Sequence, residues 1–89
     1  MNYTVVWQPP ALATLAKLWT DGPDRSALAA ASDSIDARLA LDPLSQGESR
    51  DGPYRILFVA PLVVDFEVRE AERTVLVLRV RRTRWITPG

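Results

Sequence analysis

The stretch from residue 62 to residue 82 decides the fold and reads LVVDFEVREAERTVLVLRVRR. Residues 62–69 and 74–82 alternate between apolar and polar side chains, which is typical of strands with one buried face. The charged residues 70–73 between the two runs have the length of a hairpin loop. The stretch therefore predicts two antiparallel strands joined by a short turn.

The alternation of the two strands also predicts how they pair. We expect Phe66 to lie opposite Leu78 on the buried face, because a pairing register shifted by one residue would place core residues opposite polar ones. The same register places Asp65 opposite Arg79 on the other face, where opposite charges attract. The core residues predicted for the second strand are Leu76, Leu78 and Val80.

The residues before this hairpin predict two more strands and two helices. We expect strands at residues 3–7 and 54–59, and a helix from about residue 23 to residue 41. Residues 42–53 are polar and predict a long loop. The buried face predicted for the first helix comprises Leu12, Leu15, Ala16 and Trp19. The face predicted for the second comprises Leu28, Ala31, Ile35 and Leu39.

The order β-α-α-β-β-β predicts an α+β fold in one domain spanning residues 1–89. We expect a mainly antiparallel four-stranded sheet with a helical hairpin packed on one face. Trp7, Trp19 and Tyr54 are expected in the core. The opposite face is expected to carry Arg55, Asp65, Glu67, Arg79 and Arg81.

Composition limits the chemistry that this chain can perform. Cysteine and histidine are both absent from the sequence, which excludes disulfides, thiolate metal sites and histidine acid–base catalysis. We expect no cofactor, and the carboxylates are too scattered to predict a metal site. No apolar run is long enough to cross a membrane, and the first residues do not resemble a signal peptide, so we expect a cytoplasmic protein.

The net charge is zero, but its distribution is uneven. Residues 49–89 carry eight arginines and five acidic residues. Arginine presents a planar guanidinium suited to phosphate or carboxylate groups. The asymmetry therefore favours a polyanion or an acidic protein as the partner, although a solvated surface is the plainer interpretation.

Three short segments resemble the RelE/ParE toxins of bacterial type II toxin–antitoxin systems. They are Leu41-Asp42-Pro43-Leu44, Tyr54-Arg55-Ile56-Leu57 and the last strand at residues 75–82. The resemblance implies a toxin held inactive by an antitoxin that is encoded by the adjacent gene. RelE-like members cut mRNA in the ribosomal A site, and ParE-like members poison DNA gyrase. The resemblance therefore implies the ribosome with mRNA, or DNA gyrase, as the target.

The resemblance also implies which residues would act. The basic position on the family's second strand matches Arg55, and the basic cluster at the end of its last strand matches Arg81 and Arg82, with Arg84 just beyond. RNA cleavage by the 2′-hydroxyl needs a base, cations at the phosphate and an acid for the leaving oxygen. Glu67 is the candidate base. The candidate RNA-binding or partner-binding residues are Arg79, Arg84 and Trp85.

The chain departs from the RelE-like pattern at two places. Many RelE-like toxins open the third strand with a Tyr-Arg pair, whereas this chain has Leu62-Val63. Many also end in a tyrosine or histidine that donates a proton, whereas this chain has Trp85, whose indole is no proton-transfer acid. The arginines favour a RelE-like, metal-free endoribonuclease. The departures favour a ParE-like gyrase inhibitor or a catalytically inactive relative that binds protein. The prediction for this chain is the RelE-like endoribonuclease, and the other two are its alternatives.

Overall fold

The structure, a computed structural model, describes residues 2–83. Its elements in chain order are β1 (Thr4–Trp7), α1 (Pro9–Asp21), α2 (Arg25–Leu41), the 3-10 helix η1 (Pro43–Ser45), β2 (Glu48–Ser49), β3 (Tyr54–Val59), β4 (Leu62–Arg69), the 3-10 helix η2 (Glu70–Glu72) and β5 (Thr74–Arg82). The predicted α+β class is confirmed, and the long strands and α2 begin and end within two residues of their predicted bounds.

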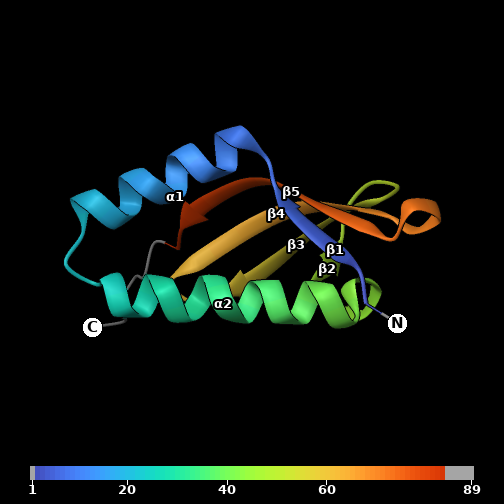
Figure 1. Cartoon of the computed structure of the whole chain (residues 1–89), viewed down its shortest axis with the longest axis horizontal. Coiled ribbons are helices and arrows are strands. Elements are labelled where there is room, and N and C mark those ends of the chain that lie inside the picture. Colours follow the sequence, from blue (N-terminus) through green and yellow to red (C-terminus); the bar gives the residue numbers. More distant parts are fainter. Residues whose placement is uncertain (1, 84–89) are drawn as a thin grey trace.

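The strands form one sheet in the order β1-β5-β4-β3-β2 (Figure 1). The first strand pairs with the last in parallel, and the other neighbours are antiparallel. β1 is further attached to α2, because the Tyr3 amide donates to the Ala40 carbonyl and Trp7 Nε1 donates to Asp36 Oδ1 at 2.6 Å. The N-terminal strand therefore joins the sheet to the second helix.

The sheet has five strands, one more than predicted. The additional strand β2 and the short helix η1 both lie in the segment 42–53 that was expected to be a loop. Gly47 precedes β2 with a positive φ of 65°, and a Cβ there would lie 2.0 Å from the Ile56 carbonyl oxygen. Only glycine permits so close an approach of two backbones, and β2 can therefore pair with β3.

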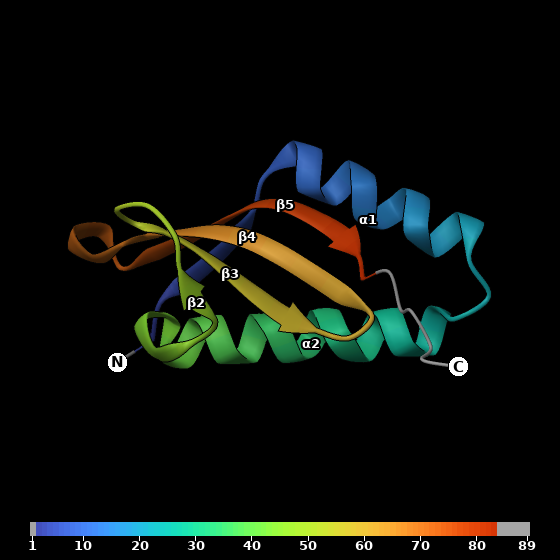
Figure 2. The same ribbon diagram turned by 180° about the vertical axis from the view of Figure 1, so that it is seen from behind.

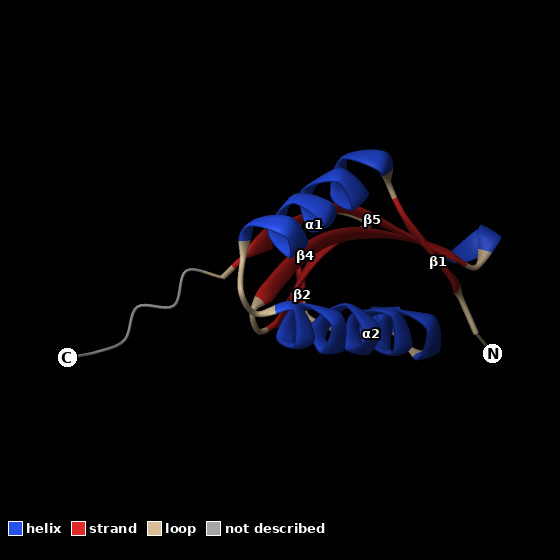
Figure 3. Ribbon diagram, turned by 60° about the vertical axis from the view of Figure 1, so that its left-hand side comes forward, coloured by secondary structure: helices blue, strands red, loops and turns tan. Residues whose placement is uncertain are grey.

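Both helices pack on the same face of the sheet and share one apolar core. α1 lies mainly on β5, while α2 contacts β1, β3 and β4. The helices diverge from their connecting turn (Figures 1 and 2), and the sheet curves between them (Figure 3). The predicted buried face of α2 is confirmed. The buried core residues are Ala11, Leu28, Ala31, Ile35, Leu39, Leu57, Leu62, Val64, Phe66, Val68, Val75, Val77 and Val80.

The face that α1 turns to the sheet differs from the prediction. Ala11, Leu15 and Leu18 face the core, while Leu12 and Trp19 are exposed. Both sets have helical spacing, so periodicity alone does not separate them. An alanine at the contact lets the helix backbone lie close to β5, whereas Leu12 would hold it further away. The Trp19 ring instead lies against the Arg25 guanidinium. The distance from Arg25 Cζ to the centre of the ring is 5.9 Å.

A β-bulge in β5 changes the predicted pairing. Asp65 lies opposite Arg79 as expected, but Phe66 pairs with Val77, and Leu78 is the extra residue between them. One additional residue reverses the side-chain alternation of its strand. Val75 and Val77 therefore face the helices in place of the residues predicted there. The sequence from residue 75 to residue 78 is apolar at every position, so its pattern did not reveal the reversal.

Two phenylalanines, one buried and one exposed, test which face of the sheet packs against the helices. Phe66 is fully buried, and Phe58 is 62% exposed on the other face. We expect Phe66→Ala to lower the free energy of unfolding by about 3–5 kcal/mol. Phe58→Ala should lower it by less than about 1 kcal/mol. Urea denaturation of both variants measures the difference, and equal losses would contradict the assigned faces.

Candidate functional site

The sheet face turned away from the helices, here called the outer face, contains the candidate site. Its residues follow from the pairing of β3, β4 and β5, because side chains opposite each other in a sheet point the same way. The outward residues form three rows: Phe58–Val63–Arg81, Ile56–Asp65–Arg79 and Tyr54–Glu67–Leu76. The outer face thus combines apolar, basic and acidic side chains.

Two of the predicted arginines lie on the outer face. Arg79 Nε lies 3.3 Å from Asp65 Oδ2, and the predicted ion pair between them is confirmed. The Arg79 side chain is nevertheless 81% exposed, so the pair contributes only about 0–1 kcal/mol to stability. Arg81 is exposed in the neighbouring row, and it forms no ion pair with any other residue between 2 and 83.

Arg82 lies on the helix side of the sheet, away from the outer face. It pairs with the core residue Leu62 in β4 and reaches the start of α2. There Arg82 Nη1 and Nη2 donate to the two carboxylate oxygens of Asp24 at 2.6 and 3.0 Å. Gly22 leaves room for this contact, because a Cβ at that position would lie 2.7 Å from Arg82 Nη2. The expected cluster of Arg81 and Arg82 is therefore divided between two faces.

The ion pair between Arg82 and Asp24 changes the acidity of both groups. The hydrogen bond from Arg82 holds the pKa of the Asp24 carboxyl below its usual value. The same bond raises the pKa of Arg82 above its ordinary value. A bidentate guanidinium–carboxylate contact has a fixed geometry, so this pair ties the end of β5 to the turn between the helices.

The prediction that Arg55 belongs to the outer face is also wrong. It lies opposite Phe66, on the helix side of the sheet, because Ile56 and not Arg55 faces outward in β3. Arg55 Nε donates to the Gln46 carbonyl at 3.0 Å, and Nη2 reaches the Gly47 carbonyl at 3.4 Å. Arg55 thus holds the segment before β2 in place.

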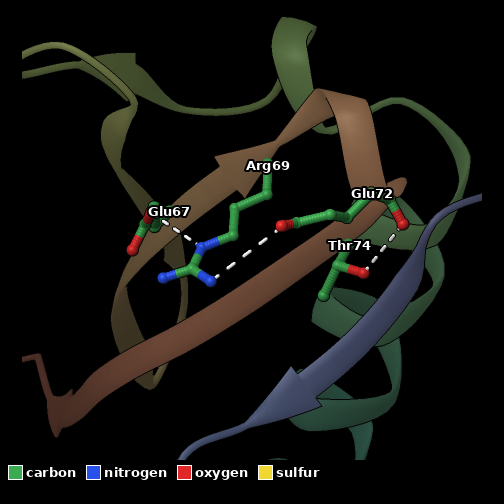
Figure 4. A network of polar contacts seen from close by, with 4 residues as sticks. All are labelled: Glu67, Arg69, Glu72 and Thr74. Atoms are coloured by element: carbon green, nitrogen blue, oxygen red, sulfur yellow. Dashed lines mark hydrogen bonds and ion pairs between the residues drawn. The ribbon is translucent and has the colours of Figure 1, made fainter.

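Glu67, the candidate base, lies on the outer face but is already engaged. Arg69 Nε donates to Glu67 Oε2 at 3.0 Å, and Arg69 Nη1 lies 4.0 Å from Glu72 (Figure 4). The hydroxyl of Thr74 donates to the Glu72 carbonyl in the same network. The bond to Glu67 raises the pKa of Arg69. Glu67 therefore takes part in a surface ion-pair network at the hairpin end of the sheet.

The aromatic residues depart from their predicted places. Tyr54 was expected in the core but lies on the outer face and is 44% exposed. Trp19 was also expected in the core and is exposed, whereas Trp7 packs against the core as predicted. The candidate residues Arg84 and Trp85 lie outside the described part of the chain.

Sequence reasoning overlooked the apolar part of the outer face. Ile56 and Val63 are buried there without joining the main core cluster, and Phe58 is exposed beside them. The signal was present in β3, which is apolar at every position from Ile56 to Val59 and so has an apolar side chain on both faces. Tyr54, which is expected in the core, has the same strand parity as Ile56 and Phe58, so the prediction places all three on the helix side.

The segment 2–83 contains no group of three or more acidic side chains placed to hold a metal ion. None of its helices is long and apolar enough to cross a bilayer.

Comparison with known proteins gives structural neighbours only. No protein-family model matches the sequence, and no curated protein matches it. A chain of the toxin–antitoxin complex RelBE2 from Mycobacterium tuberculosis superposes with a TM-score of 0.72 at 24% identity, covering 92% of both chains. The isolated E. coli RelE toxin superposes with a TM-score of 0.60 at 10% identity, covering 94% of this chain and 87% of RelE.

The chain has the RelE/ParE toxin fold. A chain of the chromosomal ParDE system from P. aeruginosa superposes with the same TM-score of 0.72, at 18% identity, covering 92% of this chain and 97% of its own length. RelE and ParE types therefore both lie among the neighbours. The RelE/ParE fold alone does not separate the two activities, and the side chains of the outer face have to distinguish them.

The contact between Asp24 and Arg82 predicts a pH-dependent stability. A carboxyl whose pKa is lower in the folded than in the unfolded state stabilises the fold. This stabilisation is fully present above the unfolded pKa of about 3.9, and it is lost as the pH falls through the folded pKa. We expect Asp24→Asn to lower the urea midpoint at pH 7 and to lose this effect at an acidic pH below the folded pKa of Asp24.

The matched control is Asp33→Asn, because Asp33 is exposed on α2 and forms no ion pair within the described segment. Its urea midpoint should follow the wild type at both pH values. An Asp24→Asn variant as stable as the wild type at pH 7 would show that the contact contributes nothing to the fold.

Proposed function

We propose that this chain is the toxin of a type II toxin–antitoxin pair, and that it inhibits its target by binding a protein rather than by cutting RNA. The RelE/ParE fold supports the first part, together with neighbours from the RelBE2 toxin–antitoxin complex and the ParDE system. The expected regulator is a cognate antitoxin encoded beside it, and the expected location is the cytoplasm.

The observation that carries the second part is the separation of the four arginines. Arg82 is bound to Asp24, and Arg55 is bound to backbone carbonyls on the helix side. On the outer face Arg79 lies beside Asp65, which leaves Arg81 as the one of these four whose side chain has neither an ion pair nor a hydrogen bond to another residue of the segment 2–83. A phosphorane needs several preorganised cations around one phosphate, and this arrangement does not gather them.

The position of Glu67, the candidate base, also speaks against RNA cleavage. Glu67 accepts a hydrogen bond from Arg69. It is four residues along β4 from Val63, the partner of Arg81, which corresponds to about 13 Å of strand. A base must lie within hydrogen-bond reach of the 2′-hydroxyl while the cations hold the adjacent phosphate. Protein binding has no such requirement, and ParE-like inhibition of DNA gyrase is the first activity to test.

RelE-like cleavage of mRNA on the ribosome is the second candidate. The side chains of Arg79 and Arg81 are open to solvent on one strand, and the exposed Tyr54 and Phe58 lie on the same face. Arginines can hold phosphates, and aromatic rings can stack on unpaired bases. The ribosome would have to supply the remaining catalytic groups.

Expression in bacteria followed by two biochemical assays tests the proposal. We expect the wild-type chain to arrest growth, to inhibit DNA supercoiling by purified gyrase, and to leave mRNA intact on translating ribosomes. Arg81→Ala should restore growth at least about tenfold in colony number without changing the thermal midpoint, since Arg81 is exposed. Arg38→Ala, an exposed arginine on α2, is the matched control and should remain toxic.

Two results would contradict the proposal. Cuts in the A-site codon that disappear in the Arg81→Ala variant would establish the nuclease instead. The wild-type chain should also be expressed in cells that carry no antitoxin gene. If it folds there and does no harm, a toxin of either kind is excluded.

A further inference from the structure

We propose that the outer face is a docking surface for a protein segment that carries apolar side chains and at least one carboxylate. This inference rests on the proposed binding function and adds the surface and the chemistry of the partner. We call this area the Phe58 surface; it comprises Tyr54, Ile56, Phe58, Val63, Arg79 and Arg81.

The apolar part of the Phe58 surface is continuous across two strands. Phe58 lies directly opposite Val63, and Ile56 and Tyr54 follow on the same side of β3. Val63 and Ile56 are buried, whereas Phe58 is 62% exposed and Tyr54 is 44% exposed. Buried aliphatic side chains flanked by exposed aromatic rings are typical of the centre of a protein interface, where aromatic anchors are enriched.

The charges of the Phe58 surface favour an acidic partner. Arg81 lies in the same row as Phe58, separated from it by Val63, and Arg79 follows in the next row. The Arg79 side chain is 81% exposed, while its neighbour Asp65 is 28% exposed. The Arg79 side chain is therefore more accessible than that of Asp65, and Arg81 is exposed as well, so an approaching segment meets positive charge beside Phe58. Arginine is also enriched at interface hot spots.

A single-stranded nucleic acid fits this surface less well than a protein segment. Its phosphates repeat along the whole strand, so a strand held by Arg79 and Arg81 would continue past other charges of the outer face. The carboxylates of Asp65 and Glu67 occupy the next outward positions of β4, and Glu48 lies opposite Ile56 in β2. Arg79 and Arg69 already pair with Asp65 and Glu67. A strand of phosphates would therefore meet little net positive charge beyond Arg81, whereas a peptide can place a carboxylate at Arg81 and apolar groups elsewhere.

Selection from a random library of 14-residue displayed peptides, with the full-length protein as bait, tests the proposal. We expect the enriched peptides to combine Asp or Glu with apolar side chains. Their affinity should fall about tenfold or more on Arg81→Glu, and similarly on Phe58→Ala. The control is Leu41→Ala, because Leu41 is 71% exposed at the end of α2; this variant should bind like the wild type.

A charge exchange separates recognition from damage to the fold. A selected peptide in which Lys replaces the acidic residue should bind the Arg81→Glu protein more tightly than it binds the wild type. Enriched peptides that are basic, or that bind the Arg81→Glu protein unchanged, would overturn the proposal. So would a 14-nucleotide oligouridylate that binds the wild type more tightly than the selected peptides and displaces them.

The last alternative is that a second copy of the chain binds the Phe58 surface. A wild-type dimer in sedimentation that Phe58→Ala dissociates would overturn the proposal in favour of self-association. None of these binding measurements depends on growth arrest. Peptides that bind as expected to a chain that proves harmless would leave the docking surface in place and exclude the toxin.

Discussion

The extra residue in β5 at Leu78 determines which side chains face the helices and which face outward. Without it, the half of β5 that carries Val75 and Val77 could not bury these valines in the same core as Val80. A sheet strand alternates strictly, so two runs of opposite parity can share one face only through a bulge. The core under both helices therefore depends on this one irregularity, which also turns Leu76 to the outer face.

Strand alternation separates guanidinium groups that are adjacent in sequence. Arg81 points outward and the next residue, Arg82, points to the helices, where Asp24 receives it. Arg82 and Arg55 consequently hold the turn between the helices and the segment before β2, and both have structural partners. The outer face retains Arg79 and Arg81 beside exposed aromatic rings. This is a surface suited to binding, and its chemistry differs from that of a nucleolytic centre.

Much of this fold could be predicted from the sequence, because the signals were local. Alternation defined β4, helical spacing defined α2, and opposite charges predicted the pairing of Asp65 with Arg79. The faces of β3, α1 and β5 could not be predicted in the same way. Each has apolar residues on both sides, so that either side satisfies the pattern, and tertiary packing makes the choice. Misassigning the face of β3 moved Arg55 and Tyr54 to the wrong sides, and with them part of the predicted site.

Thiol reactivity in β5 tests the central claim most directly, because the chain contains no cysteine of its own. Leu76→Cys and Val77→Cys place single thiols at neighbouring positions that the bulge assigns to opposite faces. The account predicts that the thiol at position 76 reacts readily with a maleimide in the folded protein. The thiol at position 77 should react only as fast as the protein unfolds. A protected thiol at 76 together with a reactive one at 77 would show that β5 pairs without a bulge, and would contradict the account.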